Sequence, residues 1–342
     1  MAILFMEGFE GYADSTDFFA DTRFTKSGTN STPDFATGRT GGQCLYANTS
    51  LDDFYINLPQ TSTDTVFMGF AIYVSSTAST TTGPIVMLVD SNGIDTLTVY
   101  LTSTNQIQVR RGASVTLGTS SAIPYNVWNY VEMKFLLSET VGTIDVYLNG
   151  VSEISDTGLD TIDTSGSANC RRVLFTPPYS GTQYYDDMYF GDDSGSDVTD
   201  LIGDVVIEQL LVDGAGSSTQ FTPSTGSNFQ NIDETTPDGD TTYNSSSTAT
   251  HKDLFTTASI AGSVDTVYAV QVNSVFRKEG AGFRAVRNKI LSSATEGSGA
   301  TTPMPYDEYA ATGDIFENDP NGGGNWTESA VNAMEIGYEL VS

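Results

Sequence analysis

The sequence predicts an all-β protein in which a β-sandwich is followed by a smaller β-rich domain with one short helix. Three observations support this prediction: a strand–turn–strand pattern at residues 128–150, short apolar runs that recur through the first half, and turn-forming clusters between them. The 128–150 pattern lacks the apolar residues three and four apart that an amphipathic helix needs. Short strands separated by polar turns are typical of sandwiches.

A β-hairpin is expected at residues 128–150, where inward and outward residues alternate with a period of two. Its expected inward residues are Val131, Met133, Phe135, Leu137, Ile144, Val146 and Leu148. Glu132 and Lys134 fall on the opposite face, where we expect solvent. A turn at residues 138–142 joins the strands, and Asn149-Gly150, a strong turn dipeptide, closes the second one.

The other strands of the first domain are expected at apolar runs bounded by Ser, Thr, Gly, Asn and Asp. These runs are residues 3–5, 66–74, 85–89, 97–101, 107–109, 173–175 and 185–190. Residues 191–200 are dense in Gly, Asp and Ser and predict a boundary between domains at 1–195 and 200–342.

In the second domain a new apolar pattern starts at Ile202, and strands are expected at residues 264–276, 283–291 and 335–341. The short helix is expected at residues 326–334. Residues 217–252 form a polar segment that is too long for an ordinary connection. Because its backbone would otherwise lack partners, we expect it to be ordered against another subunit or protein.

The composition of the chain argues against several classes of partner and location. Lys+Arg 14 against Asp+Glu 43 gives 14 − 43 = −29, which repels phosphate backbones and anionic lipids, so nucleic acid is not an expected partner. No stretch approaches the roughly 18 apolar residues of a membrane helix, and the apolar run at residues 3–6 has no basic residue before it, unlike a signal peptide. We therefore expect neither membrane insertion nor a secretory route. Cys44 and Cys170 allow either one disulfide across the sandwich or two free core thiols.

The hairpin resembles a run found near the middle of concanavalin A-like (laminin-G/lectin/glucanase) jelly-roll domains. The residues that carry the resemblance are Asn126, Trp128, Glu132, Gly142, Thr143, Val146, Leu148, Asn149 and Gly150. With shorter matching pieces, the resemblance covers about the first 195 residues. It implies a lectin-like jelly roll and no particular chemistry.

The second half resembles a domain of tailed-bacteriophage virion structural proteins. The residues that carry this resemblance are Ile202-Gly203-Asp204-Val205, Gln220-Phe221-Thr222-Pro223, Asn231-Ile232-Asp233-Glu234, Pro237-Asp238-Gly239-Asp240-Thr241-Thr242-Tyr243, Asp319-Pro320 and Trp326-Thr327. The resemblance implies a place in a virion that is assembled in the host cytoplasm, on the tail or as a capsid decoration. Other virion proteins would be partners, and the chain would form a symmetric homo-oligomer, with a trimer as one arrangement.

Candidate binding residues come from the hairpin and from aspartate pairs. Tyr125, Trp128, Tyr130 and Tyr147 lie near one another and suit stacking on a host sugar, unless that face is buried in the protein. Asp186 and Asp192, from the pairs at residues 186–187 and 192–193, suggest calcium, the one cofactor considered; a third pair lies at residues 52–53. Capping of loops by aspartate is the alternative.

Candidate docking residues come from the polar segment and from a basic pair. They are Asp233, Asp238, Asp240, Tyr243 and Arg277. Arg110-Arg111, Arg171-Arg172 and Arg277-Lys278 hold six of the basic residues, which we expect to pair with acidic groups of a neighbouring subunit.

The sequence favours a non-enzymatic role. Jelly-roll glycosidases of the retaining class carry a Glu-x-Asp-x-x-Glu run that places carboxylates on one strand face, and this run is missing here. His251 is the lone histidine, and no Gly-x-Ser-x-Gly elbow is present. Two hypotheses follow: a phage surface appendage with a lectin-like domain, or a soluble carbohydrate-binding or carbohydrate-cleaving protein.

Overall fold

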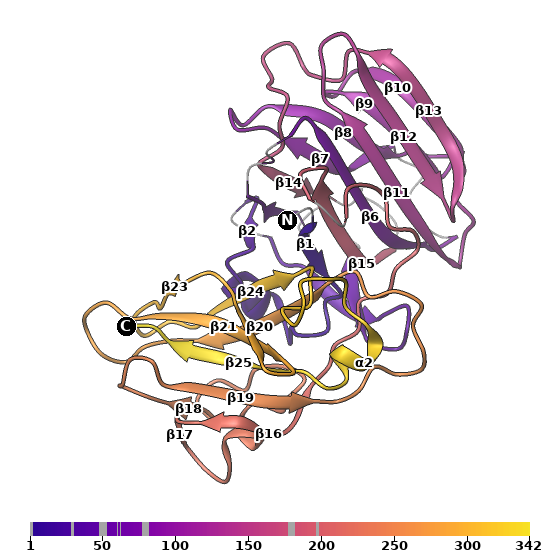
Figure 1. Cartoon of the computed structure of the whole chain (residues 1–342). Coiled ribbons are helices and arrows are strands. Elements are labelled where there is room, and N and C mark those ends of the chain that lie inside the picture. The colour runs from indigo at the N-terminus through magenta and orange to yellow at the C-terminus, as the bar shows by residue number, and fades with distance from the viewer. Residues whose placement is uncertain are drawn as a thin grey trace. The chain divides into compact units, whose positions relative to one another are not determined.

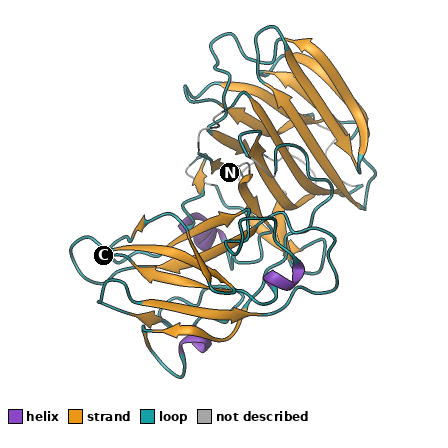
Figure 2. Cartoon of the chain, in the orientation of Figure 1, coloured by secondary structure: helices purple, strands orange, loops and turns teal. Residues whose placement is uncertain are grey.

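The computed structural model describes residues 3–28, 31–47, 53–59, 61, 63–76, 82–176, 182–195 and 198–342. The chain forms two compact units: unit 1 is Met1–Glu10 with Arg23–Ile207, and unit 2 is Gly11–Thr22 with Glu208–Ser342. Nearly every element is a strand, and the helices are short (Figures 1 and 2). The predicted fold class, a β-sandwich followed by a smaller β-rich part, is confirmed.

Unit 1 consists of two antiparallel sheets packed face to face (Figure 1). Within the described ranges, the first sheet has eight strands: β13 (Val151–Leu159), β12 (Gly142–Leu148), β11 (Trp128–Leu136), β6 (Thr65–Val74), β15 (Gln183–Asp192), β4 (Gln43–Ala47), β3 (Asp34–Thr37) and, beside β15, β1 (Ile3–Glu7). The second has seven: β10 (Val115–Ala122), β9 (Gln106–Arg111), β8 (Asp95–Leu101), β7 (Gly83–Val89), β14 (Arg172–Phe175), β5 (Phe54–Asn57) and β2 (Phe24–Lys26).

The core of unit 1 lies between these sheets. Tyr185 of the eight-stranded sheet contacts Phe175 of the seven-stranded sheet edge-on, with ring centroids 4.6 Å apart. Phe70 and Phe54 extend the aromatic contacts on the two sides. Burying rings of this size is the main favourable term for a sandwich, because each removes a large apolar area from water.

The predicted hairpin is β11 and β12, and its inward face is confirmed. Phe135 pairs with Ile144 across the strands, and both are fully buried, as are Val131, Met133 and Val146. The closing turn has positive φ at Asn149 (51°) and Gly150 (76°), as a two-residue hairpin turn requires.

Unit 2 is β-rich and has its own core. Its main antiparallel sheet contains β16 (Val212–Thr219), β19 (Lys252–Thr257), β25 (Glu335–Leu340), β21 (Ala285–Ser292), β22 (Thr295–Ser298) and β23 (Thr302–Pro303). Two short ladders join β17 (Thr222–Pro223) to β18 (Asn244–Ser245) and β20 (Val270–Phe276) to β24 (Ala310–Phe316). Trp326 and Ile290 are central to a core that the predicted helix, α2 (Glu328–Val331), covers through Val331.

Residues 11–22 belong to unit 2 and contain a short helix that the sequence analysis missed. Asp14 caps a short helix, α1 (Ser15–Ala20), by accepting hydrogen bonds from the backbone N–H groups of Thr16 and Asp17. The segment is held in unit 2 where Thr22 N donates to Ala311 O at 3.3 Å. The units therefore differ from the predicted boundary: residues 11–22 belong to unit 2, and residues 198–207 belong to unit 1. A further short helix, η1 (Asn228–Asn231), is also new.

Two remaining expectations concern the thiols and the membrane. Cys44 and Cys170 are both free and buried, which selects the second of the two open alternatives. In the part of the chain that is described, no helix combines the length and apolarity needed to cross a bilayer.

Candidate functional site

The four tyrosine and tryptophan residues proposed for sugar stacking do not share one environment. Tyr125, in the turn before β11, is 43% exposed, and Trp128 and Tyr147 are half-buried. Tyr130 is only 2% exposed, and its hydroxyl donates to Asp187 O at 3.1 Å. The expectation that Tyr130 offers a stacking surface is therefore wrong.

The reason is that an irregular segment of unit 1, residues 198–207, packs on the outer face of the eight-stranded sheet. We call this segment the strap. Glu132 Oε1 accepts hydrogen bonds from Gly203 N at 2.7 Å and from the Tyr189 hydroxyl at 2.8 Å. Lys134 Nζ lies 3.0 Å from Asp200 Oδ1. Glu132 is consequently 5% exposed, so its predicted surface position is also wrong.

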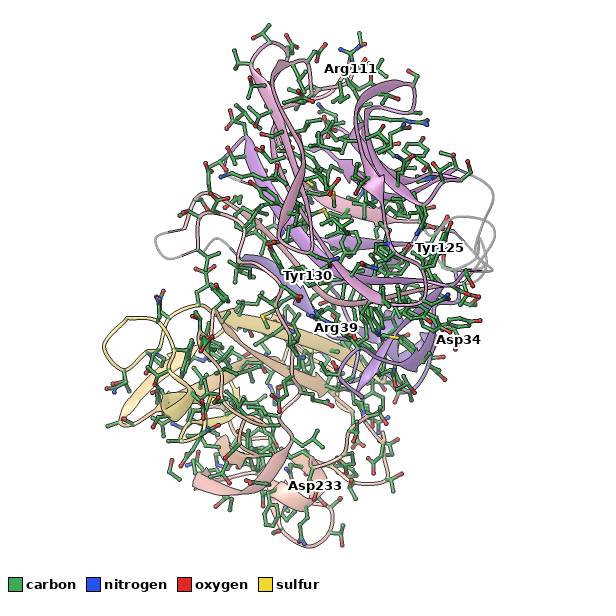
Figure 3. The ribbon with its side chains drawn as sticks, turned by 90° about the vertical axis from the view of Figure 1, so that its right-hand side faces the viewer. Asp34, Arg39, Arg111, Tyr125, Tyr130 and Asp233 are labelled. Atoms are coloured by element: carbon green, nitrogen blue, oxygen red, sulfur yellow. The ribbon has the colours of Figure 1, made fainter. Side chains whose placement is uncertain are left out.

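Arg39 completes the cover over Tyr130. Its guanidinium carbon lies 5.5 Å from the Tyr130 ring centroid, and Figure 3 shows the two side chains close together. The same guanidinium pairs with Asp187 at 3.3 Å and with Asp204 of the strap at 2.5 Å. A cation over an aromatic face that also joins two carboxylates holds the strap against the sheet.

The carboxyl groups of Asp186, Asp187 and Glu10 interact electrostatically. Burial, together with the neighbouring charge of Asp187, raises the pKa of Asp186 to about 7. Burial likewise raises the pKa of Asp187 to about 6 and that of Glu10 to about 9. These carboxyl groups therefore take up protons in the folded protein more readily than in the unfolded chain.

The calcium candidates are engaged in local hydrogen bonds. Asp186 accepts from the backbone N–H groups of Arg39 (2.8 Å) and Asp187 (2.9 Å), and Asp192 accepts from Ser194 N (3.1 Å). Over the described ranges, neither belongs to a group of three or more side chains that could hold a metal ion. Asp52 lies outside the described residues. The hydrogen bonds agree with loop capping, and calcium binding stays a prediction.

The outer face of the same sheet carries a row of partly exposed aromatic residues that the sequence analysis did not find as a unit. It consists of Tyr46, Tyr184, Tyr73 and Trp128, on the adjacent strands β4, β15, β6 and β11. Tyr184 is the direct cross-strand partner of both Tyr46 and Tyr73, and Tyr73 is the partner of Trp128. Opposite residues of antiparallel strands point to the same face, so the four rings form one line across the strands.

The geometry of the aromatic row is continuous. Successive ring centroids are 5.1 Å (Tyr46–Tyr184), 5.4 Å (Tyr184–Tyr73) and 5.8 Å (Tyr73–Trp128) apart. All four side chains are half-buried, and exposed Asp34 pairs with Tyr46 at one end of the row. Figure 3 shows Asp34 and Tyr125 on one side of the ribbon, away from Tyr130 and Arg39. The row thus combines exposed ring area with fixed positions.

Comparisons with known proteins give similarity of fold only. No known protein family matches the chain by sequence, and no curated protein does. Among solved structures, cellulose induced protein Cip1 is 18% identical (54% of this chain, 96% of that chain, TM-score 0.40). Domain 4 of the GH43 extracellular arabinanase AbnA from Geobacillus stearothermophilus, in complex with arabinotriose, is 16% identical (56% and 92%, TM-score 0.37). The carbohydrate binding module CBM66 from Bacillus subtilis is 12% identical (50% and 97%, TM-score 0.34).

The predicted docking residues lie in unit 2. Asp240 pairs with Arg277 at 2.7 Å and accepts from the Tyr309 hydroxyl at 2.5 Å. Asp238 accepts from Thr242 Oγ1 at 2.9 Å. Asp233 is exposed, and so is Tyr243, at 43%. Asp240 and Arg277 thus contact each other within the chain, and docking of a neighbouring subunit through these residues stays a prediction.

The polar segment at residues 217–252 is folded onto unit 2 itself. Ser224 N donates to Tyr243 O at 2.8 Å beside the β17–β18 ladder, and Asn244 Nδ2 donates to the Tyr338 hydroxyl at 2.9 Å. Asp253 Oδ2 accepts from Asn228 Nδ2 at 2.6 Å. The argument that this backbone needs partners from another chain is therefore wrong, and docking through it stays a prediction.

The chemistry available to the lone histidine is limited. His251 Nδ1 lies 2.9 Å from Ser246 Oγ, which also accepts from Thr248 N. Within the described residues, no carboxylate forms a hydrogen bond with His251 to orient the ring as a general base. The pair resembles a turn contact more than a nucleophile–base pair.

Proposed function

We propose that the protein is a non-enzymatic surface appendage of a tailed-bacteriophage virion, and that unit 1 binds a host glycan on the aromatic row. The single observation that supports glycan binding is the line of Tyr46, Tyr184, Tyr73 and Trp128 on adjacent strands. Attachment to a virion is supported by the sequence resemblance of the second half, and the non-enzymatic role by the missing Glu-x-Asp-x-x-Glu run.

The form of the row suits a chain of neutral sugar rings. Tyrosine and tryptophan offer flat apolar faces together with a polar edge, and the C–H faces of pyranose rings stack on such surfaces. Neighbouring strands lie roughly 4.8 Å apart, so a glycan that runs across the strands meets one aromatic ring for each strand that it crosses.

The polar edges of the row are available to a ligand. In the part of the chain that is described, no hydrogen bond engages the hydroxyl groups of Tyr46, Tyr73 and Tyr184 or Nε1 of Trp128. Sugar hydroxyl groups are partners for these atoms.

The test is binding of the full chain to immobilised neutral oligosaccharides of increasing length, measured by biolayer interferometry. Trp128→Ala removes a terminal ring of the row and should weaken binding about tenfold, since an aromatic contact contributes roughly 0.5–1.5 kcal/mol beyond its buried area. Tyr306→Ala is the matched control, because Tyr306 is 61% exposed in unit 2. Equal binding by both variants, or no binding by the intact chain, would contradict the glycan proposal.

Attachment to a virion and the absence of enzymatic activity are tested by separate measurements. Copy number on purified particles, by quantitative mass spectrometry, should be constant for an appendage. Incubation of the intact chain with the same oligosaccharides should release no sugar. Sugar release that ends when one carboxylate is replaced would instead support the alternative, a soluble carbohydrate-cleaving protein.

A further inference from the structure

A polar hollow of about 390 Å³ lies in unit 1 at a different place from the aromatic row. It is formed where β5 and β7 end and β14 begins, and Asn57, Asp90, Ser91, Asn92, Arg171 and Arg172 line it. The strand pairings show that the hollow and the aromatic row lie in different parts of unit 1. The hollow lies where Arg172 of β14 pairs with Val89 of β7, whereas the row crosses β15 at Tyr184 in the other sheet.

The two arginines of the hollow differ in their contacts. The Arg172 guanidinium carbon lies 4.0 Å from the Tyr55 ring centroid, and its charge acts on the carboxyl group of Asp95. Arg171 is exposed, and among the described residues its guanidinium has no hydrogen bond or ion pair. Arg110, Arg172, Lys278 and Arg284 also have no ion pair among the described residues, but each of their charged groups meets an aromatic ring or a hydrogen-bond acceptor.

The acidic residue of the hollow does not supply a partner for Arg171. Asp90 is 2% exposed, and its Oδ1 accepts from the backbone N–H groups of Asn92 and Ile94, both at 2.8 Å. Its Oδ2 accepts from Ser167 N at 2.7 Å. Asp90 therefore uses its carboxylate to hold the β7–β8 turn, and the charge is compensated by backbone dipoles.

The walls of the hollow are held in place by further hydrogen bonds. Arg171 N donates to Val89 O at 2.9 Å, and Leu58 N donates to Arg171 O at 3.1 Å, so the backbone of Arg171 is fixed on both sides. Asn92 Nδ2 donates to Ser167 Oγ at 2.8 Å. The backbone of the site therefore loses little conformational entropy when a ligand binds.

We infer that this hollow is a second ligand site, which takes a carboxylated monosaccharide of the hexuronate type. The planar guanidinium of Arg171 matches the two oxygens of a carboxylate. Ser91 contributes a hydroxyl group and Asn92 a side-chain carbonyl oxygen, and both suit sugar hydroxyls. A volume near the lower end of the usual range for small-molecule sites fits one sugar ring. The inference does not depend on glycan binding by the aromatic row.

The experiment is saturation-transfer NMR and isothermal titration of the full chain with sodium glucuronate. Glucose is the neutral control, and inorganic phosphate tests whether any oxyanion is enough. We expect glucuronate to bind in the roughly millimolar range and glucose to bind at least tenfold more weakly, which corresponds to about 1.4 kcal/mol. Glucuronate affinity should fall as salt rises, because the attraction between exposed charges is screened.

Three single-residue variants test whether glucuronate binds in the hollow. Arg171→Ala should lower glucuronate affinity at least tenfold, while Arg284→Ala, which removes an exposed arginine of unit 2, should not change it. Trp128→Ala should also leave it unchanged, which separates the hollow from the aromatic row. The inference is overturned if the intact chain binds no glucuronate, if glucose binds equally well, if phosphate binds better, or if Arg171→Ala binds as the intact chain does.

Discussion

Replacing Glu132 tests whether the strap covers the sheet. The alternation in β11 predicts a solvent-exposed carboxylate whose removal costs within about 0.5 kcal/mol. The structure instead gives Glu132 Oε1 two short hydrogen bonds, from the Tyr189 hydroxyl at 2.8 Å and from Gly203 N at 2.7 Å. Glu132→Ala removes the acceptor, so both donors lose their hydrogen-bond partner on a face that the strap covers.

The magnitude follows from these two contacts. A hydrogen bond to a charged group contributes about 1.5–3 kcal/mol, and a buried donor left unsatisfied costs about 1–3 kcal/mol. Relaxation of the strap recovers part of this, so we expect Glu132→Ala to lower the free energy of unfolding of unit 1 by about 3 kcal/mol. Glu132→Gln keeps an acceptor oxygen at the same place and should cost about 1 kcal/mol.

The assay must read unit 1 alone, because a chain of two units need not unfold in one transition. Urea titration followed by hydrogen exchange and mass spectrometry of peptides from β11 meets this need. Glu139→Ala, in the exposed turn of the same hairpin, is the matched control and should fall within about 0.5 kcal/mol of the intact chain. If Glu132→Ala and Glu139→Ala have the same urea midpoint, the strap does not cover Glu132 and the reasoning is refuted.

Three further predictions concern unit 1. Phe135→Ala should cost about 3–5 kcal/mol by leaving a cavity without changing the exchange of unit 2 peptides, and a loss shared equally by both units would contradict this. Because burial raises the pKa of Glu10 to about 9, the folded state binds more protons than the unfolded chain, so stability should fall as pH rises from about 5 to about 9; urea midpoints of Glu10→Gln should depend less on pH, and an unchanged slope would exclude Glu10 as the cause. Burial also raises the pKa of the Cys44 and Cys170 thiols to about 12, so both should react with a chromogenic disulfide reagent at roughly pH 8 only after denaturation, and rapid reaction of the native protein would show that they are accessible.

The strands of unit 1 follow from local sequence. Alternation places Phe135 and Ile144 on one face because successive side chains of a strand point to opposite sides. Asn149-Gly150 closes the hairpin because both residues tolerate positive φ. These rules act over two to ten neighbouring residues, so they need no knowledge of the rest of the chain.

Which faces are covered depends on contacts between distant residues. Glu132 and Tyr130 read as surface residues by alternation, yet Gly203 of the strap and Arg39 cover them. Nothing near residue 132 in the sequence signals that cover. For the same reason, the predicted boundary left residues 11–22 in the first domain, since their place in unit 2 depends on a contact with Ala311.

In the candidate sites, too, some residues follow from local sequence and others only from the tertiary structure. Trp128 was identified from its own hairpin, whereas Tyr46, Tyr73 and Tyr184 join it only because the sheet order places β4, β15, β6 and β11 side by side. The sequence by itself determined that the protein is all-β, where many of its strands lie and which side chains face the core, because these depend on period-two alternation and turn chemistry. Only the tertiary structure decided which outward faces stay exposed, because strand order and the path of the strap bring together residues far apart in the chain.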